Sequence, residues 1–182
     1  MNNELNIAAL KHGLITGLAI AVIVIFFAFI SRDAYMGAAV WFGLILSIGL
    51  PVYFGLKEKG KLGGYISFGE AFAYFAIAYF IASFFWEFAD ITVLGVMDPA
   101  ILDIMLEEAM PQAEEAMRMF IDDESLIEEQ LDKTEVEVRK KGSYMFLLTN
   151  SWWFLIKALV LGAIGGLIIK KSKPDFEEEI TE

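Results

Sequence analysis

Four charged side chains lie within or at the ends of long apolar segments and are the first candidates for chemistry: Glu70, Glu87, Asp90 and Lys157. A charge in hydrocarbon is unfavourable, so such residues pair with an opposite charge, face water, or conduct protons and ions. Three carboxylates and one amine could carry protons or bind a charged ligand. They could equally be structural pairs, and the elements that position them decide between these roles.

Lys157 is the hardest of the four to place. It lies near the middle of the apolar run 143–169, about 18 Å from either end at 1.5 Å per residue. A central lysine costs about 2.5–3.5 kcal/mol on insertion scales, so it should face protein or water rather than lipid. We expect Lys157 to point into a helix bundle, with Glu87 as its charged partner. Binding of an anionic ligand or a place in a proton path is the functional alternative.

Glu87 and Asp90 continue one polar face of the third apolar run. Together with Tyr79 and Ser83 they recur at the spacing of a single helix face,. At 1.5 Å per residue, Glu87 lies about 26 Å beyond Glu70. We therefore expect Glu87 and Asp90 to have reached the membrane surface opposite Glu70.

The composition excludes several kinds of active site. Cysteine is absent and His12 is the one histidine, so thiolate chemistry and histidine-cluster metal sites are ruled out. Neither a phosphate-binding loop nor a nucleophile–base motif is visible. The acids Asp122, Asp123 and Glu124 lack the spacing of an EF-hand, which leaves calcium binding as a minor alternative. We expect a non-enzymatic protein with no catalytic residue, cofactor or bound metal, and His12 as an interfacial residue.

Four long apolar runs must position these side chains, at about residues 12–30, 36–56, 68–97 and 143–169. Each is near or above the ~20 residues with which an α-helix crosses the hydrocarbon. Hydrophobic residues make up 57% of the chain and the mean hydropathy is +0.56. The sequence thus predicts an all-α integral membrane protein, with residues 1–182 forming a single membrane domain of four transmembrane helices. The first run is longer than the core of a signal peptide, so we expect it to be retained.

Small residues recur every four positions on three of these runs and predict helix–helix seams, because they permit close packing in lipid. A homodimer through a Gly-x-x-x-Gly face is the alternative. The stripes are Gly13, Gly17 and Ala21; Gly43, Ser47, Pro51 and Gly55; and Ala158, Gly162 and Gly166.

The segment 98–142 is an acidic insert with 14 acids and 5 bases. Its apolar periodicity predicts two or three short amphipathic helices. The first begins at Asp98-Pro99, a new stretch follows Pro111, and a capping box is expected at Ser125-x-x-Glu128. Such an acidic chain is a poor nucleic-acid binder. We expect the insert to be a contact surface for other membrane proteins.

The distribution of lysine and arginine predicts the orientation of the chain. Both termini and the 57–67 loop share one side and carry seven lysines, against four basic residues near the span ends on the other side. This difference favours both termini in the cytoplasm and the insert 98–142 outside it.

The loop before the third run contains Gly63, Gly64, Ser67 and Glu70. Ser67-x-x-Glu70 is a capping-box pattern, and the glycines supply turn flexibility. An acid at the cytoplasmic mouth of a pathway is the functional alternative for Glu70. The segment opening this run reads Gly64-Tyr65-Ile66-Ser67-Phe68-Gly69-Glu70-Ala71-Phe72.

The chain resembles the bacterial domain of unknown function 4199 family. Four features carry the resemblance: this segment, the acidic loop, the Gly-rich last run and the Lys-rich, Pro-containing ending at 169–174. The resemblance implies a multi-pass protein of the bacterial cytoplasmic (inner) membrane. It implies no activity and no catalytic residue.

Two functions remain open from the sequence. The first is a structural or accessory protein of the inner membrane. The alternative is a small oligomeric transporter or channel that uses Lys157 with Glu87, Asp90 or Glu70. Visible inverted repeats of the runs, which many transporters contain, are absent. Partners are the lipid bilayer, other membrane proteins through 98–142, and a second copy of the chain if the Gly-x-x-x-Gly faces dimerise.

Overall fold

The computed structural model describes residues 3–172; Lys173, Pro174 and the acidic residues that follow lie outside the described part. In that part the chain is helical, without a β-strand, and the expected all-α fold is confirmed. The helices are α1 (Asn3–Ile30), α2 (Arg32–Ala34), α3 (Val40–Lys61), α4 (Phe68–Thr92), α5 (Ala100–Arg118), α6 (Glu124–Lys140) and α7 (Tyr144–Ile169), with the π-helical turns η1 (Tyr35–Ala39) and η2 (Val93–Met97).

Four helical stretches are long and apolar enough to cross a membrane: Asn3–Ile30, Arg32–Lys61, Phe68–Met97 and Tyr144–Ile169. Each contains one of the runs recognised in the sequence. The first two extend further than expected, because polar residues at the helix ends continue the helix without adding to the apolar run. The second and third include η1 and η2, single π-helical turns that leave the helix uninterrupted.

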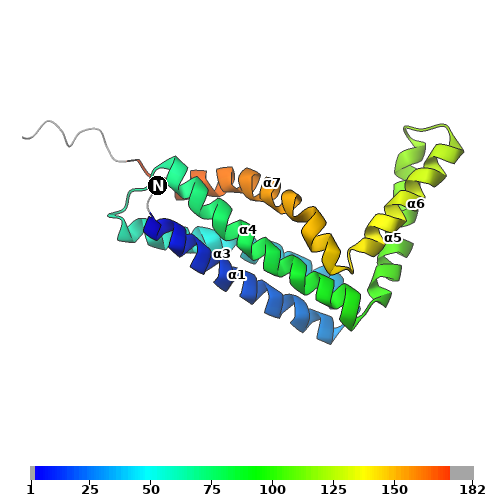
Figure 1. Ribbon diagram of the computed structural model, residues 1–182, viewed down its shortest axis with the longest axis horizontal. Coiled ribbons are helices and arrows are strands. Elements are labelled where there is room, and N and C mark those ends of the chain that lie inside the picture. The colour runs from blue at the N-terminus through cyan, green and yellow to red at the C-terminus, as the bar shows by residue number, and fades with distance from the viewer. Residues whose placement is uncertain (1–2, 173–182) are drawn as a thin grey trace, which may run out of the picture.

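Helix α4 is the central element of the bundle. It contacts α1, α3 and α7, and the three outer helices run beside it over most of its length (Figure 1). The α5–α6 pair leaves the end of this bundle at a steep angle and stands clear of it (Figure 1). The buried core accordingly follows α4, with Tyr74, Phe75 and Ala82 less than 2% exposed.

The small-residue stripes form the seams between helices, as the sequence predicted. Gly13 of α1 faces the backbone of Ala78, and Gly166 of α7 faces the backbone of Phe72. Gly43 of α3 lies under the Trp86 ring. All the stripe residues except Ala21 are buried within this single chain. These faces are therefore used inside the bundle, which removes the glycine faces as a basis for the homodimer.

The turn before α4 has the geometry that its residues predict. Gly63 and Gly64 both have positive φ values, 79° and 87°, where a side chain would be strained,. Ser67 then caps α4: its hydroxyl accepts from the Glu70 amide, and the Glu70 carboxylate accepts from the Ser67 amide, a confirmed capping box. A backbone bridge between Ile66 and Lys171 ties this turn to the end of α7.

Three boundaries in the acidic segment differ from the expected ones. Helix α5 continues through Pro111, whose ring is accommodated in one helix from Ala100 to Arg118. Helix α6 starts earlier than Ser125 because Asp123, not Ser125, is its N-cap and accepts from the Ser125 amide at 2.9 Å. The N-cap of α5 is Pro99 and not Asp98, and the Asp98 carboxylate binds Arg32.

Candidate functional site

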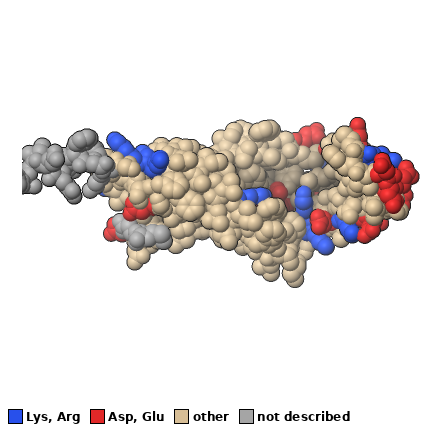
Figure 2. Space-filling view, turned by 90° about the horizontal axis from the view of Figure 1, so that it is seen from above, with Lys and Arg blue, Asp and Glu red and all other residues tan. Residues whose placement is uncertain are grey.

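A hollow of about 920 Å³ lies where α4, α6 and α7 meet, beside the base of the α5–α6 pair. In the space-filling view it separates the apolar body from the charged end of the molecule (Figure 2). Three of the four charges singled out in the sequence line it: Glu87, Asp90 and Lys157. The remaining lining residues are Thr134, Glu137, Val138, Lys140, Lys141, Ser143, Met145, Phe146, Thr149, Asn150, Trp152, Trp153 and Phe154.

Glu87 and Asp90 reach the hollow from one face of α4, three residues apart. Asp90 accepts a hydrogen bond of 2.6 Å from the hydroxyl of Tyr35, which is 6% exposed and lies in η1. Glu87 makes no hydrogen bond or ion pair within residues 3–172, and its nearby charges are Asp90, Lys157 and Lys141. The two carboxylates thus differ: one is held by the fold and the other is available.

Lys157 lies on α7 at the edge of the hollow and is exposed, although its neighbours Phe154 and Ala158 are buried against the bundle. It interacts electrostatically with Glu87. Within residues 3–172, however, it makes neither a hydrogen bond nor an ion pair. Lys157 therefore faces the open hollow instead of the interior of the bundle, and the expected direct pair with Glu87 is not formed.

The first turns of α7 indicate how deep Lys157 lies. Thr149, Asn150 and Ser151 are consecutive polar residues, and Trp152 and Trp153 follow as an exposed, stacked pair with ring centroids 4.9 Å apart. Tryptophans prefer the headgroup level of a bilayer. Lys157 follows these rings by about 6–8 Å along the helix at 1.5 Å per residue, a distance that a lysine side chain spans.

Two ion pairs fix the base of the α5–α6 pair above the hollow. Arg32, at the start of α2, donates to both oxygens of Asp98, one of them at 2.9 Å. The guanidinium beside it holds the pKa of Asp98 below its usual value. Arg139 of α6 donates to Asp103 of α5 at 3.0 Å and joins the two helices.

Glu70 does not belong to this site. Its carboxylate is engaged in the cap of α4 at the other end of that helix, about 26 Å from Glu87 at 1.5 Å per residue. The same is true of Gly63 and Gly64, which shape the turn that precedes the cap. The sequence candidates thus divide into a hollow at one end of the bundle and a turn at the other.

The polar partners of two candidates could not be found from the sequence. Tyr35 lies 55 residues from Asp90, and no local pattern connects them. His12 was expected at an interface without a role, yet its Nδ1 is 2.7 Å from the hydroxyl of the fully buried Tyr74, and its Nε2 is 3.8 Å from Glu58. We call these three residues the His–Tyr–Glu cluster; it joins α1, α3 and α4 at the end of the bundle opposite the hollow.

The site has no arrangement that would hold a metal through protein ligands. Within residues 3–172 no group of three or more histidine, aspartate or glutamate side chains converges closely enough for that. What the hollow offers is a carboxylate on α4 and an amine on α7, in a space bordered by aromatic rings. Such a site can bind an amphiphilic charged molecule.

Fold and site define the class of protein: an all-helical chain with four helices long and apolar enough to cross a membrane, and a charged hollow at one end. The family model described as Protein of unknown function (DUF4199) matches residues 11–171, so the chain belongs to that family. The match covers every helix from α2 to α7 completely and α1 from Lys11 onward. No curated protein and no solved structure matches the chain.

Proposed function

We propose that this chain is a non-enzymatic, multi-pass protein of the bacterial cytoplasmic membrane that serves as an accessory to another membrane protein, which it contacts through the α5–α6 pair. The observation that carries the proposal is the tip of that pair. Phe120 and Met119 are 87% and 70% exposed there, at the point farthest from the bundle. An exposed aromatic residue at a projecting tip is typical of a binding anchor.

The charge around the tip supports a partner with a basic surface. Acidic side chains dominate the end of the molecule formed by α5 and α6 (Figure 2), and the segment 98–142 carries 14 acids and 5 bases. Complementary charge accelerates association and selects the partner. The partner proposed is therefore a protein segment that combines basic residues with an apolar pocket for Phe120.

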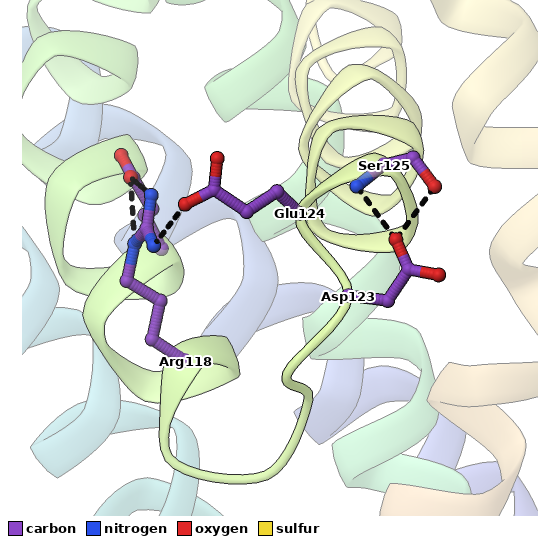
Figure 3. A network of polar contacts seen from close by, with 5 residues as sticks. Arg118, Asp123, Glu124 and Ser125 are labelled. Carbon is purple, nitrogen blue, oxygen red and sulfur yellow. Dashed lines mark hydrogen bonds and ion pairs between the residues drawn. The ribbon is translucent and has the colours of Figure 1, made fainter.

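The turn that presents Phe120 is held in one shape. Arg118 donates to Glu114 on its own helix and to Glu124 across the turn, each at 2.9 Å, and Asp123 caps the start of α6 (Figure 3). Hydrogen bonding to Ser125 lowers the pKa of Asp123, so the cap remains ionised at neutral pH. A preorganised tip loses less conformational entropy on binding.

The interior of the bundle argues against a conduction path. Between the His–Tyr–Glu cluster and the Tyr35–Asp90 pair, the core of the described part is apolar. Its buried polar groups in the described residues are the hydroxyl of Thr16, which has no partner, that of Ser47, which bonds within its own helix, and that of Tyr79, which bonds to Ser83. An oligomeric transporter is the alternative, and the hollow favours it by opening charges to one face of the bundle.

Site-specific photo-crosslinking in cells tests the accessory role. A photoreactive residue at Phe120 should give a discrete heterologous product, and Asp122→Asn, Asp123→Asn, Glu124→Gln should abolish it. A photoreactive residue at Val136, which is 53% exposed on α6, is the matched control and should give none. Identical products at both positions, or a product unaffected by removal of the acids, would contradict the proposal.

The proposed orientation places both termini in the cytoplasm and the α5–α6 pair outside. It is supported by Lys57, Lys59 and Lys61, which end α3 on the same side as the start of α1. Because the chain has no cysteine, single cysteines at Glu115 and Ser172 can be labelled with an impermeant maleimide in intact cells. Labelling at 115 alone is expected, and labelling at 172 alone means that the orientation is reversed.

A further inference from the structure

Glu87 and Lys157 face the same hollow with opposite charges, yet they do not touch. Neither side chain has a hydrogen bond or an ion pair within the part of the chain that the structure describes, whereas the adjacent Asp90 is bound by Tyr35. A direct pair would close the space between them. An open space between a carboxylate and an amine fits a ligand that carries both a negative and a positive group.

The charges of the whole lining point to the same class of ligand. Glu87, Asp90 and Glu137 are balanced by Lys140, Lys141 and Lys157. A lining with three charges of each sign does not select a strongly anionic molecule. It favours one whose own charges cancel and are separated along its length.

The position of the hollow relative to the bilayer indicates an amphiphile. The stacked pair Trp152–Trp153 forms part of its wall and marks the headgroup level,. Beyond Lys157, α7 exposes Val160 and Ile164, which are 58% and 52% exposed, along the course that acyl chains would take. Polar groups of a ligand in the hollow would therefore lie above an apolar track.

We propose that this hollow binds one phospholipid whose headgroup carries a phosphate and a primary ammonium. Lys157 donates to a phosphate oxygen, Glu87 accepts from the ammonium, and the acyl chains lie along Val160 and Ile164. A primary ammonium is favoured over a quaternary one because it can donate hydrogen bonds to the carboxylate. The proposal does not depend on the partner of the α5–α6 pair.

Native mass spectrometry of the purified full chain in mild detergent tests the proposal. The probes are phosphatidylethanolamine, phosphatidylglycerol and phosphatidylcholine, each titrated at matched acyl composition. The chain should retain one phosphatidylethanolamine molecule about 10-fold more tightly than either other lipid, the factor expected for one charge-assisted hydrogen bond. Equal retention of all three lipids would overturn the assignment of the headgroup.

Variants separate the two halves of the headgroup site. Lys157→Met should weaken retention of all three lipids about 10-fold, and Lys157→Arg should preserve it. Glu87→Gln should abolish the preference for phosphatidylethanolamine while phosphate binding persists. Lys133→Met is the control, because Lys133 is exposed on α6, ion-paired with Glu129 and outside the hollow.

Unchanged lipid retention in Lys157→Met would overturn the proposal, as would loss of retention in Lys157→Arg with a parental melting temperature. Displacement of the lipid by millimolar inorganic phosphate would overturn it by identifying a free anion as the ligand. Lipid-free dimers that form with increasing protein concentration and disappear in Lys157→Met would show instead that a second copy occupies the hollow.

Discussion

The close contact between α7 and α4 predicts how a substitution at Gly166 changes the free energy of unfolding. A Cβ atom at this position would lie 2.9 Å from the Cα and 3.0 Å from the amide nitrogen of Phe72. Both are backbone atoms of the central helix, so no side-chain rotation can relieve the contact. Gly166→Ala therefore forces α7 away from α4.

Gly49 provides a matched control, since it also lies within a helix long enough to cross a membrane and a Cβ there would meet nothing within 4 Å. Replacing a helical glycine by alanine favours the helix by about 0.5–1 kcal/mol, and overpacking costs about 1–3 kcal/mol. Gly49→Ala should therefore be neutral or stabilising. Gly166→Ala should lower the free energy of unfolding, and the difference between the two variants, about 1–3 kcal/mol, measures the clash.

Gly17→Ala should also lower the free energy of unfolding. Its added Cβ would lie 2.8 Å from the Cβ of Phe85, an atom that rotation of the side chain does not move. The assay is reversible unfolding in mixed micelles with increasing dodecyl sulfate, followed by helical circular dichroism. Equal unfolding free energies for the alanine variants at 49 and 166 would refute the reasoning that α7 packs on α4 through backbone contact.

Three further outcomes are expected. Lys157→Met and Glu87→Gln should couple by about 1 kcal/mol in a double-mutant cycle, because their opposite charges attract across the hollow without contact; strict additivity would contradict the shared environment. Because Arg32 lowers the pKa of Asp98, their pairing stabilises the fold above the unfolded pKa of about 4 and is lost as pH falls through the folded pKa. Arg32→Gln should therefore flatten the acid limb of a curve of unfolding free energy against pH. An unchanged acid limb would show that the Arg32–Asp98 pair does not stabilise the fold. Tyr74→Phe should cost about 1–3 kcal/mol by leaving the imidazole of the His–Tyr–Glu cluster without its hydrogen bond, and parental stability would show that water replaces the hydroxyl.

Features that repeat along one helix could be predicted from the sequence. The apolar runs set the helices, and the four-residue spacing of Gly13 and Gly17 placed them on a buried seam. The cap at Ser67 and Glu70 was predictable because both members lie in one helical turn. In each case the physical cause acts over a few residues, so one sequence window contains it.

Contacts between distant segments could not be predicted in the same way. His12 lies 62 residues from Tyr74, and Tyr35 lies 55 residues from Asp90. Their meeting depends on how α1 and the second span are rotated against α4. Periodicity shows which face of a helix is buried, but it does not show which residue of the neighbouring helix lies opposite.

The placement of Lys157 and Glu87 illustrates this limit. The rise per residue gave a correct expectation of nearness along the bundle axis, since both line one hollow. It carried no information about the third wall, which the end of α6 supplies with Lys140 and Lys141. Lys141 interacts with both Glu87 and Asp90, so the carboxylates have a cation near them without drawing Lys157 into contact. The base of the α5–α6 pair is therefore part of the hollow, and the charge balance inside the hollow depends on where that pair leaves the bundle.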